Sequence, residues 1–171
     1  MTQLLEAELF GEQYRGVYAI LDGASVKDLR MKLFEEEPEH ECLFPGDLEP
    51  DMEEVAAHLV RLEKGTPFTD WVLQKGWGKH WGVFVFGPPD LPVLRQHLRC
   101  LLIVHDSAGN PMRFRYYDPR VLRIFLPTCT GEELGVFFGP VTRYLMEGEK
   151  PDSILNFQFA GGALQQQEKR G

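Results

Sequence analysis

Apolar residues follow two patterns along the chain, and the first is typical of β-strands. Residues 17–21 (VYAIL) and 81–86 (WGVFVF) are apolar at nearly every position, so we expect strands that are covered on both faces. Residues 153–159 alternate instead, which places Leu155, Phe157 and Phe159 on one face of a late strand. Shorter strands are predicted at residues 41–44 and 58–62, and a β-hairpin at residues 102–105 and 112–117.

The second pattern places apolar residues three and four positions apart and predicts short amphipathic helices. Leu91, Leu94 and Leu98 share one face of such a helix. Local start signals predict four more helices, at Ser25-x-x-Asp28, Thr66-Pro67, Asp118-Pro119 and Thr130-x-x-Glu133. With a further short helix expected at residues 52–57, helices and strands alternate over most of the chain.

Length and composition are sufficient for one domain, since the chain has 171 residues of which 43% are hydrophobic. The predicted elements indicate an α+β or mixed α/β fold: a compact single domain with a central mixed sheet flanked by short helices. We expect residues 1–16 to form an N-terminal segment and residues 17–160 to form the domain. The polar residues 161–171 are expected to be a disordered tail.

The charge of the chain argues against two classes of partner. A net charge of −8 and a pI near 5.1 disfavour nucleic acids and anionic membranes, because both are bound by a positive potential. The charges are also unevenly distributed. Acidic residues gather at 35–39 and 47–54, whereas six arginines lie between residues 95 and 123. We therefore expect a molecule with an acidic and a basic side.

The cysteines and the apolar runs indicate where the protein resides. Cys42, Cys100 and Cys129 are far apart and show no CxxC or metal-ligand spacing, which is typical of a reducing, cytoplasmic environment. The first sixteen residues lack the basic and apolar regions of a signal peptide. No run approaches the ~18 apolar residues of a membrane span, so we expect no membrane insertion.

The chain carries no recognisable pattern of catalytic residues. GxSxG, GxxxxGK[ST], GxGxxG and HExxH are all missing from the sequence, and no histidine has a partner at metal-ligand spacing. We expect a protein that is not an enzyme and has no catalytic residues, no metal and no cofactor. An enzyme whose active site assembles from distant residues is the alternative.

The segment FRYYDPRVLRIFLP, residues 114–127, has the highest density of functional groups. Asp118 before Pro119 predicts a helix start, because the carboxylate accepts hydrogen bonds from the first turn and proline needs no donor there. We therefore interpret Asp118 as a structural cap. The arginines around it are expected to face outward, as a solvated face or as a docking patch for an acidic partner: Arg113, Arg115, Arg120 and Arg123.

Six segments share a resemblance to one family. They are YAILDG (18–23), VAAHLVRLEKG (55–65), FTDWVLQKGWGKHWGVFVF (68–86), LRQHLRCLLIV (94–104), FRYYDPRVLRIFLP (114–127) and FFGPV (137–141). In this order they resemble the type VI secretion effector chaperone or adaptor family, often called Tap or Tec proteins, whose shared domain was once catalogued only as of unknown function. FRYYDPRVLRIFLP followed by FFGP is the most specific part.

The resemblance implies a non-enzymatic bacterial cytoplasmic protein that binds one cognate secreted effector and helps to load it onto the VgrG spike. It supplies no catalytic residues. With such a partner in view, Arg115, Tyr117, Arg120 and Arg123 are hypothesised to line the partner surface, and the acidic residues 47–54 to form a second contact. The alternative binding function is that of an immunity protein, which binds and neutralises a toxin and is also small and acidic.

Overall fold

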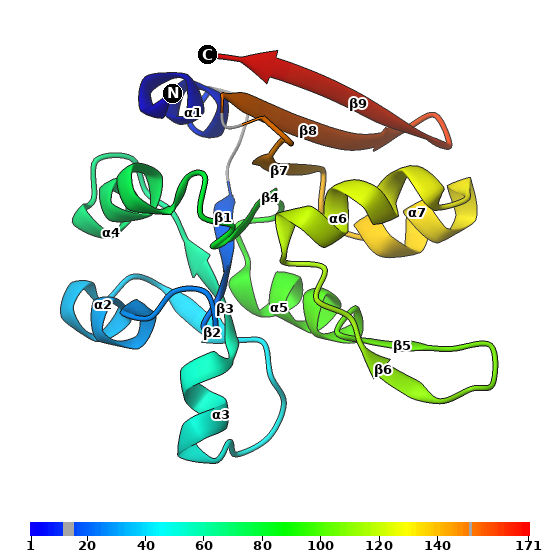
Figure 1. Ribbon diagram of the computed structural model, residues 1–171, viewed down its shortest axis with the longest axis horizontal. Helices are drawn as coiled ribbons and strands as arrows, with labels where there is room; N and C mark the ends of the chain where they lie inside the picture. Colours follow the sequence, from blue (N-terminus) through cyan, green and yellow to red (C-terminus); the bar gives the residue numbers. More distant parts are fainter. Residues whose placement is uncertain (12–15, 151) are drawn as a thin grey trace.

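A seven-stranded sheet forms the centre of the protein in the computed structural model, which describes residues 1–11, 16–150 and 152–171 (Figure 1). Its strands lie in the order β2-β3-β1-β4-β7-β8-β9. Their bounds are β1 Val17–Asp22, β2 His40–Cys42, β3 Ala57–Arg61, β4 Gly82–Phe86, β7 Arg143–Glu147, β8 Ser153–Ala160 and β9 Ala163–Arg170. A separate two-stranded hairpin consists of β5 Ile103–His105 and β6 Pro111–Arg113.

Every pairing in this sheet is antiparallel, so the prediction of a mixed sheet is wrong. Helical crossovers do connect strands that run in the same direction, such as β3 and β4. However, β1 lies between β3 and β4 and pairs with both. In the same way β4 separates β1 from β7. Strands of this sheet that run in the same direction are therefore never neighbours.

Short helices cover both faces of the sheet, as predicted for a mixed α+β domain. The helical segments are α1 Thr2–Leu9, α2 Leu29–Glu36, α3 Pro50–Val55, α4 Pro67–Trp71, the π-helix η1 Val72–Gly76, α5 Leu91–Cys100, α6 Pro119–Phe125, the 3-10 helix η2 Leu126–Thr128 and α7 Gly131–Phe138. One face of the sheet packs on α5, α6 and α7, and the other packs on α1, α2, α4 and η1. Each face has its own apolar core.

The two central strands divide their side chains between these cores. Tyr18 and Ile20 of β1 enter the first core, whereas Ala19 and Leu21 enter the second. β4 alternates in the same way, and the apolar residues of both strands are buried. The expectation of central strands covered on both sides is therefore confirmed, and it explains why these runs lack polar positions.

Two helix starts differ in outcome. Thr130 caps α7 with a capping box, in which its side chain accepts from the Glu133 amide and the Glu133 carboxylate accepts from the Thr130 amide. The Ser25 signal does not start a helix, since α2 begins only at Leu29. The Ser25 hydroxyl instead donates a hydrogen bond to Asp22 at 2.8 Å. The hydrogen bond to Asp22 thus occupies the Ser25 side chain, which would otherwise cap the helix.

The two ends of the chain belong to the folded body. Residues 163–170 form β9, which pairs with β8 along its whole length, so the expected disordered tail is a strand. Gly161 and Gly162 have φ angles of 61° and 78° and form the tight turn between them. In the N-terminal segment, α1 buries Leu5 and Leu9 completely in the second core. Residues 12–15 of that segment lie outside the described residues.

Candidate functional site

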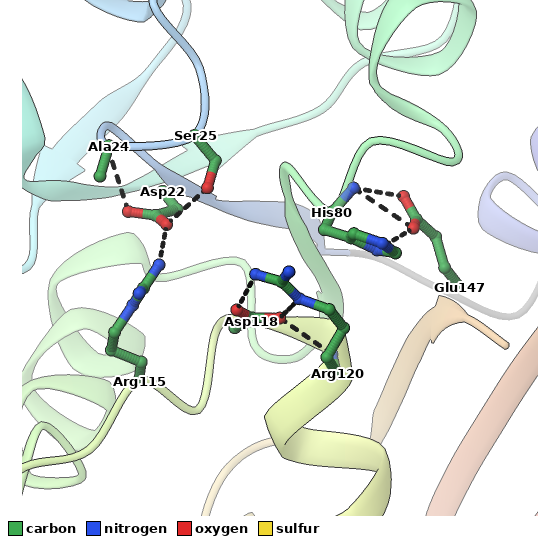
Figure 2. A network of polar contacts seen from close by, with 8 residues as sticks. All are labelled: Asp22, Ala24, Ser25, His80, Arg115, Asp118, Arg120 and Glu147. Atoms are coloured by element: carbon green, nitrogen blue, oxygen red, sulfur yellow. Dashed lines mark hydrogen bonds and ion pairs between the residues drawn. The ribbon is translucent and has the colours of Figure 1, made fainter. Parts of the chain in front are cut away.

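Three buried carboxylates gather near the C-terminal ends of the strands β1 and β7. Both strands are antiparallel to β4, so they run in the same direction and their C-terminal ends lie on the same side of the sheet. Each ends in a buried acid, Asp22 in β1 and Glu147 in β7, with exposures of 1% and 6%. Figure 2 shows Asp118, at the start of α6, in the same region. The sheet topology thus assembles acids from three distant parts of the chain.

Asp22 holds the turn after β1 to the segment before α6. Its carboxylate accepts hydrogen bonds from the Ala24 amide at 3.2 Å and the Ser25 hydroxyl at 2.8 Å. Arg115 Nη2 donates to the same carboxylate at 2.5 Å. The Arg115 side chain remains 45% exposed, so it covers the buried acid from the solvent side. This contact spans 93 positions of sequence.

Glu147 organises the loop that follows the π-helix η1. The carboxylate accepts from the backbone amides of Gly78 at 2.9 Å and His80 at 3.2 Å. Nδ1 of the His80 ring lies 2.7 Å from the same carboxylate. His80 has a φ of 57°, an uncommon conformation for a residue with a side chain, and its two contacts to Glu147 hold it there. Glu147 therefore fixes both the backbone and the ring of His80.

Asp118 is the N-cap residue of α6, and Pro119 occupies the first turn. The carboxylate accepts from the Arg120 amide at 2.9 Å and from the Arg120 guanidinium at 3.0 and 2.7 Å (Figure 2). Burial alone would raise the pKa of Asp118, but these hydrogen bonds from Arg120 outweigh it, and the pKa is lowered. Asp118 is consequently a carboxylate at neutral pH.

The geometry of this cluster indicates a structural role for the three carboxylates. Each of the three carboxylates accepts hydrogen bonds from amides or side chains of its own chain, and these satisfied acids fix the turn after β1, the His80 loop and the start of α6. Among residues 1–11, 16–150 and 152–171, no group of three His, Cys, Asp or Glu side chains is placed to hold a metal ion. The hydrogen bonds of the cluster thus hold these three segments of the backbone in place.

The residues hypothesised to line a partner surface have different surroundings. Arg120 is exposed over 52% of its side chain, beside Asp118. Arg123 Nη1 donates to the Gly148 carbonyl at 2.8 Å, so this side chain ties α6 to the end of β7. Tyr117 is only 2% exposed, which contradicts its expected place at the surface. The strand β6 ends at Arg113, so an alternation of faces cannot be extended to Tyr117.

Two apolar residues of α6 were assigned no surface role by the sequence argument. Ile124 is 67% exposed, and Val121 is 36% exposed. They follow Arg120 by four positions and by one position, respectively, and all three side chains are exposed. We call Arg120, Val121 and Ile124 the α6 outer face. The available signal was spacing, because Ile124 follows Arg120 by four positions and shares its side of the helix.

Replacing Asp118 with alanine should lower the free energy of unfolding by about 1–2 kcal/mol, because α6 loses its side-chain cap. Asp118→Asn should retain most of the stability, because an asparagine side chain would still accept a hydrogen bond from the first turn. Urea unfolding followed by circular dichroism measures both variants. Equal stability of Asp118→Ala and the parent protein would contradict the capping role.

Comparisons with known proteins identify the family. Curated proteins and solved structures gave no match. In the described part of the chain, no helix is long and apolar enough to span a membrane. A family model described as "Domain of unknown function (DUF4123)" matches residues 17–135, from the first residue of β1 into α7. Because this match spans more than half of the chain, the protein belongs to the DUF4123 family.

Proposed function

We propose that this protein is a non-enzymatic adaptor of a bacterial type VI secretion system, which binds a cognate effector in the cytoplasm and helps to load it onto the VgrG spike. Membership of the DUF4123 family supports this proposal, together with the resemblance of FRYYDPRVLRIFLP and FFGP to the effector chaperones. The arrangement of the carboxylate cluster supports it as well, because its acids fix the start of α6, the segment before α6 and the His80 loop.

The observation that carries the proposal is the α6 outer face. Ile124 and Val121 expose aliphatic side chains beside the guanidinium of Arg120, on a helix that is capped and tied at both ends. Arginine is enriched in protein–protein interfaces, and the fully buried centre of an interface is more apolar than the rest of the protein surface. A rigid helix also loses little conformational entropy when a partner binds to it. These properties suit a surface that recognises one folded partner.

Substitution of Ile124 by aspartate should weaken effector binding at least tenfold, because a charge would be placed in the apolar part of the interface. The measurement is co-purification from the native bacterium, with the bound proteins identified by mass spectrometry. Arg123 is unsuitable as a test position, since its reversal would also remove the bond to the Gly148 carbonyl. Unchanged thermal stability of Ile124→Asp shows that any loss arises at the surface.

Val93→Asp is the matched control, because Val93 is 49% exposed on a different helix, α5. This variant should retain the effector. Retention of the effector by Ile124→Asp would contradict the assignment of the α6 outer face. If neither a spike protein nor its linked effector co-purifies with the parent protein, the adaptor function itself is contradicted. Protection of cells from the toxin without any effect on its secretion would point to an immunity protein.

A further inference from the structure

A groove of about 740 Å³ follows the free edge of β2, at the opposite end of the sheet from β9. α2 and the segment around α3 form one wall, and α5 forms the other. We call it the edge groove, defined by Phe34, His40, Cys42, Phe44, Arg95 and Arg99. The α6 outer face contributes no residue to its lining.

The floor of the edge groove is a sheet edge whose carbonyls are covered by arginines. Glu39 and Leu43 bond to β3, so by alternation His40 and Cys42 direct their backbone groups outward. The Cys42 carbonyl accepts from Arg95 Nε at 3.2 Å, and the carbonyl of Phe44 accepts from Arg99 Nη2 at 3.1 Å. The side chains of Arg95 and Arg99 can rotate away from these carbonyls, whereas a neighbouring strand could not. The arginines therefore protect this edge of the sheet, but an incoming strand can displace them and pair with it.

The two walls carry opposite charge balances. On the α2–α3 wall, Arg30 is paired with Glu53 at 2.9 Å and Glu54 at 2.8 Å. On the other side, Arg99 and Arg113 form no ion pair within the part of the chain that the structure describes, although the protein is acidic overall. The Arg113 guanidinium lies over the Phe44 ring, 4.3 Å from its centre. Positive charge without a carboxylate partner is thus concentrated beside the α5 wall.

The opposite wall offers an apolar contact. Phe34 of α2 is 83% exposed and lines the groove. An aromatic ring that is left this exposed at the mouth of a groove is a common feature of binding sites, because a partner gains free energy by covering it. A ligand with an apolar side chain toward Phe34 and acidic side chains toward Arg99 and Arg113 would match both walls.

We infer that the edge groove binds an extended acidic peptide segment of a partner protein. The segment pairs with the outward backbone groups of β2 as an additional strand, in the manner of β-strand addition. Its carboxylates bind Arg99 and Arg113, and an apolar side chain covers Phe34. The inference rests on the proposed function for the identity of the partner, and it gives the adaptor a second contact that is separate from the α6 outer face.

A library of random 16-residue peptides displayed on phage tests this inference with the purified full chain, without any effector. The expected result is enrichment of peptides that contain several acidic residues and at least one apolar residue. A labelled enriched peptide should bind Arg99→Ala and Arg113→Glu at least tenfold more weakly in fluorescence anisotropy. It should bind Arg170→Glu, at the opposite edge of the sheet, with unchanged affinity. Bound peptide should slow hydrogen exchange at the amides of His40 and Cys42.

Several results would overturn the inference: no enrichment, enriched peptides without acidic residues, or unchanged affinity for both Arg99→Ala and Arg113→Glu. Self-association of the chain through β2, seen as a dimer that Arg113→Glu dissolves, would assign the groove to a second copy and also overturn it. Failure of the proposed function is a separate result. If peptides bind at the edge groove but neither an effector nor a spike protein co-purifies, the peptide-binding inference stands and the adaptor function is contradicted.

Discussion

Replacement of Gly82 by alanine is expected to lower the free energy of unfolding by more than ~4 kcal/mol, a large fraction of the total stability of a domain of this size. Gly82 begins β4 and pairs with Leu21 of β1. A Cβ atom at this position would lie 1.9 Å from the Ile20 carbonyl oxygen and 3.1 Å from the Leu21 Cα. Both obstacles are backbone atoms of a central strand, so they cannot move without separating β1 from β4. Urea unfolding followed by circular dichroism measures the loss.

Gly135→Ala is the control with the opposite expected sign. Gly135 lies within α7, and an added Cβ would meet its nearest neighbour, the Phe159 ring, at an ordinary 3.7 Å. Alanine is favoured over glycine inside a helix by about 0.5–1 kcal/mol, so this variant should be more stable than the parent protein. If Gly82→Ala folded with normal stability, β1 and β4 would have to lie farther apart than they do in this structure.

Strands with strong local signals could be predicted from the sequence, but their order could not. β1 and β4 are recognisable because a strand buried on both faces has no polar positions in its middle. Whether two such strands become neighbours depends on which strand is inserted between them, and no local pattern carries that information. β9 illustrates the reverse case. Its sequence is polar because it is an exposed edge strand, and it resembles a tail until its pairing with β8 is known.

The candidate site could be predicted only where its contacts are local. Asp118, Pro119 and Arg120 are consecutive, so the cap is readable in the sequence. Glu147 was not assigned any role, because its hydrogen-bond partners Gly78 and His80 are 69 and 67 positions away. β7 itself was missed for the same reason: its first and last residues are charged and buried, and distant parts of the chain satisfy their charges.

Replacement of Arg143 by alanine should lower the free energy of unfolding by about 3 kcal/mol, because it leaves buried polar groups without their partner. Arg143 begins β7, and its guanidinium bonds to Asn156 Oδ1 of β8. It also pairs with the Glu8 carboxylate of α1 at 2.6 Å. The loss falls at the lower end of the usual 3–5 kcal/mol range for such pairs, since Lys169 still contacts Glu8. Arg170→Ala, an exposed arginine of β9, should change stability by less than about 0.5 kcal/mol.

The pH dependence of unfolding separates the ion pair from lost packing. Burial would raise the pKa of Glu8, but hydrogen bonds from Lys169 and Arg143 outweigh it, and the pKa is lowered. A carboxylate with a lowered pKa stabilises the folded state above its unfolded pKa of about 4.3, and this contribution is lost as the pH falls through the folded value. The gap in stability between the parent protein and Arg143→Ala should therefore be largest near neutral pH and narrow in acid. A gap that stays constant with pH would show that Arg143 acts through packing and neutral hydrogen bonds, and that α1 is held to β7 and β9 without this charge pair.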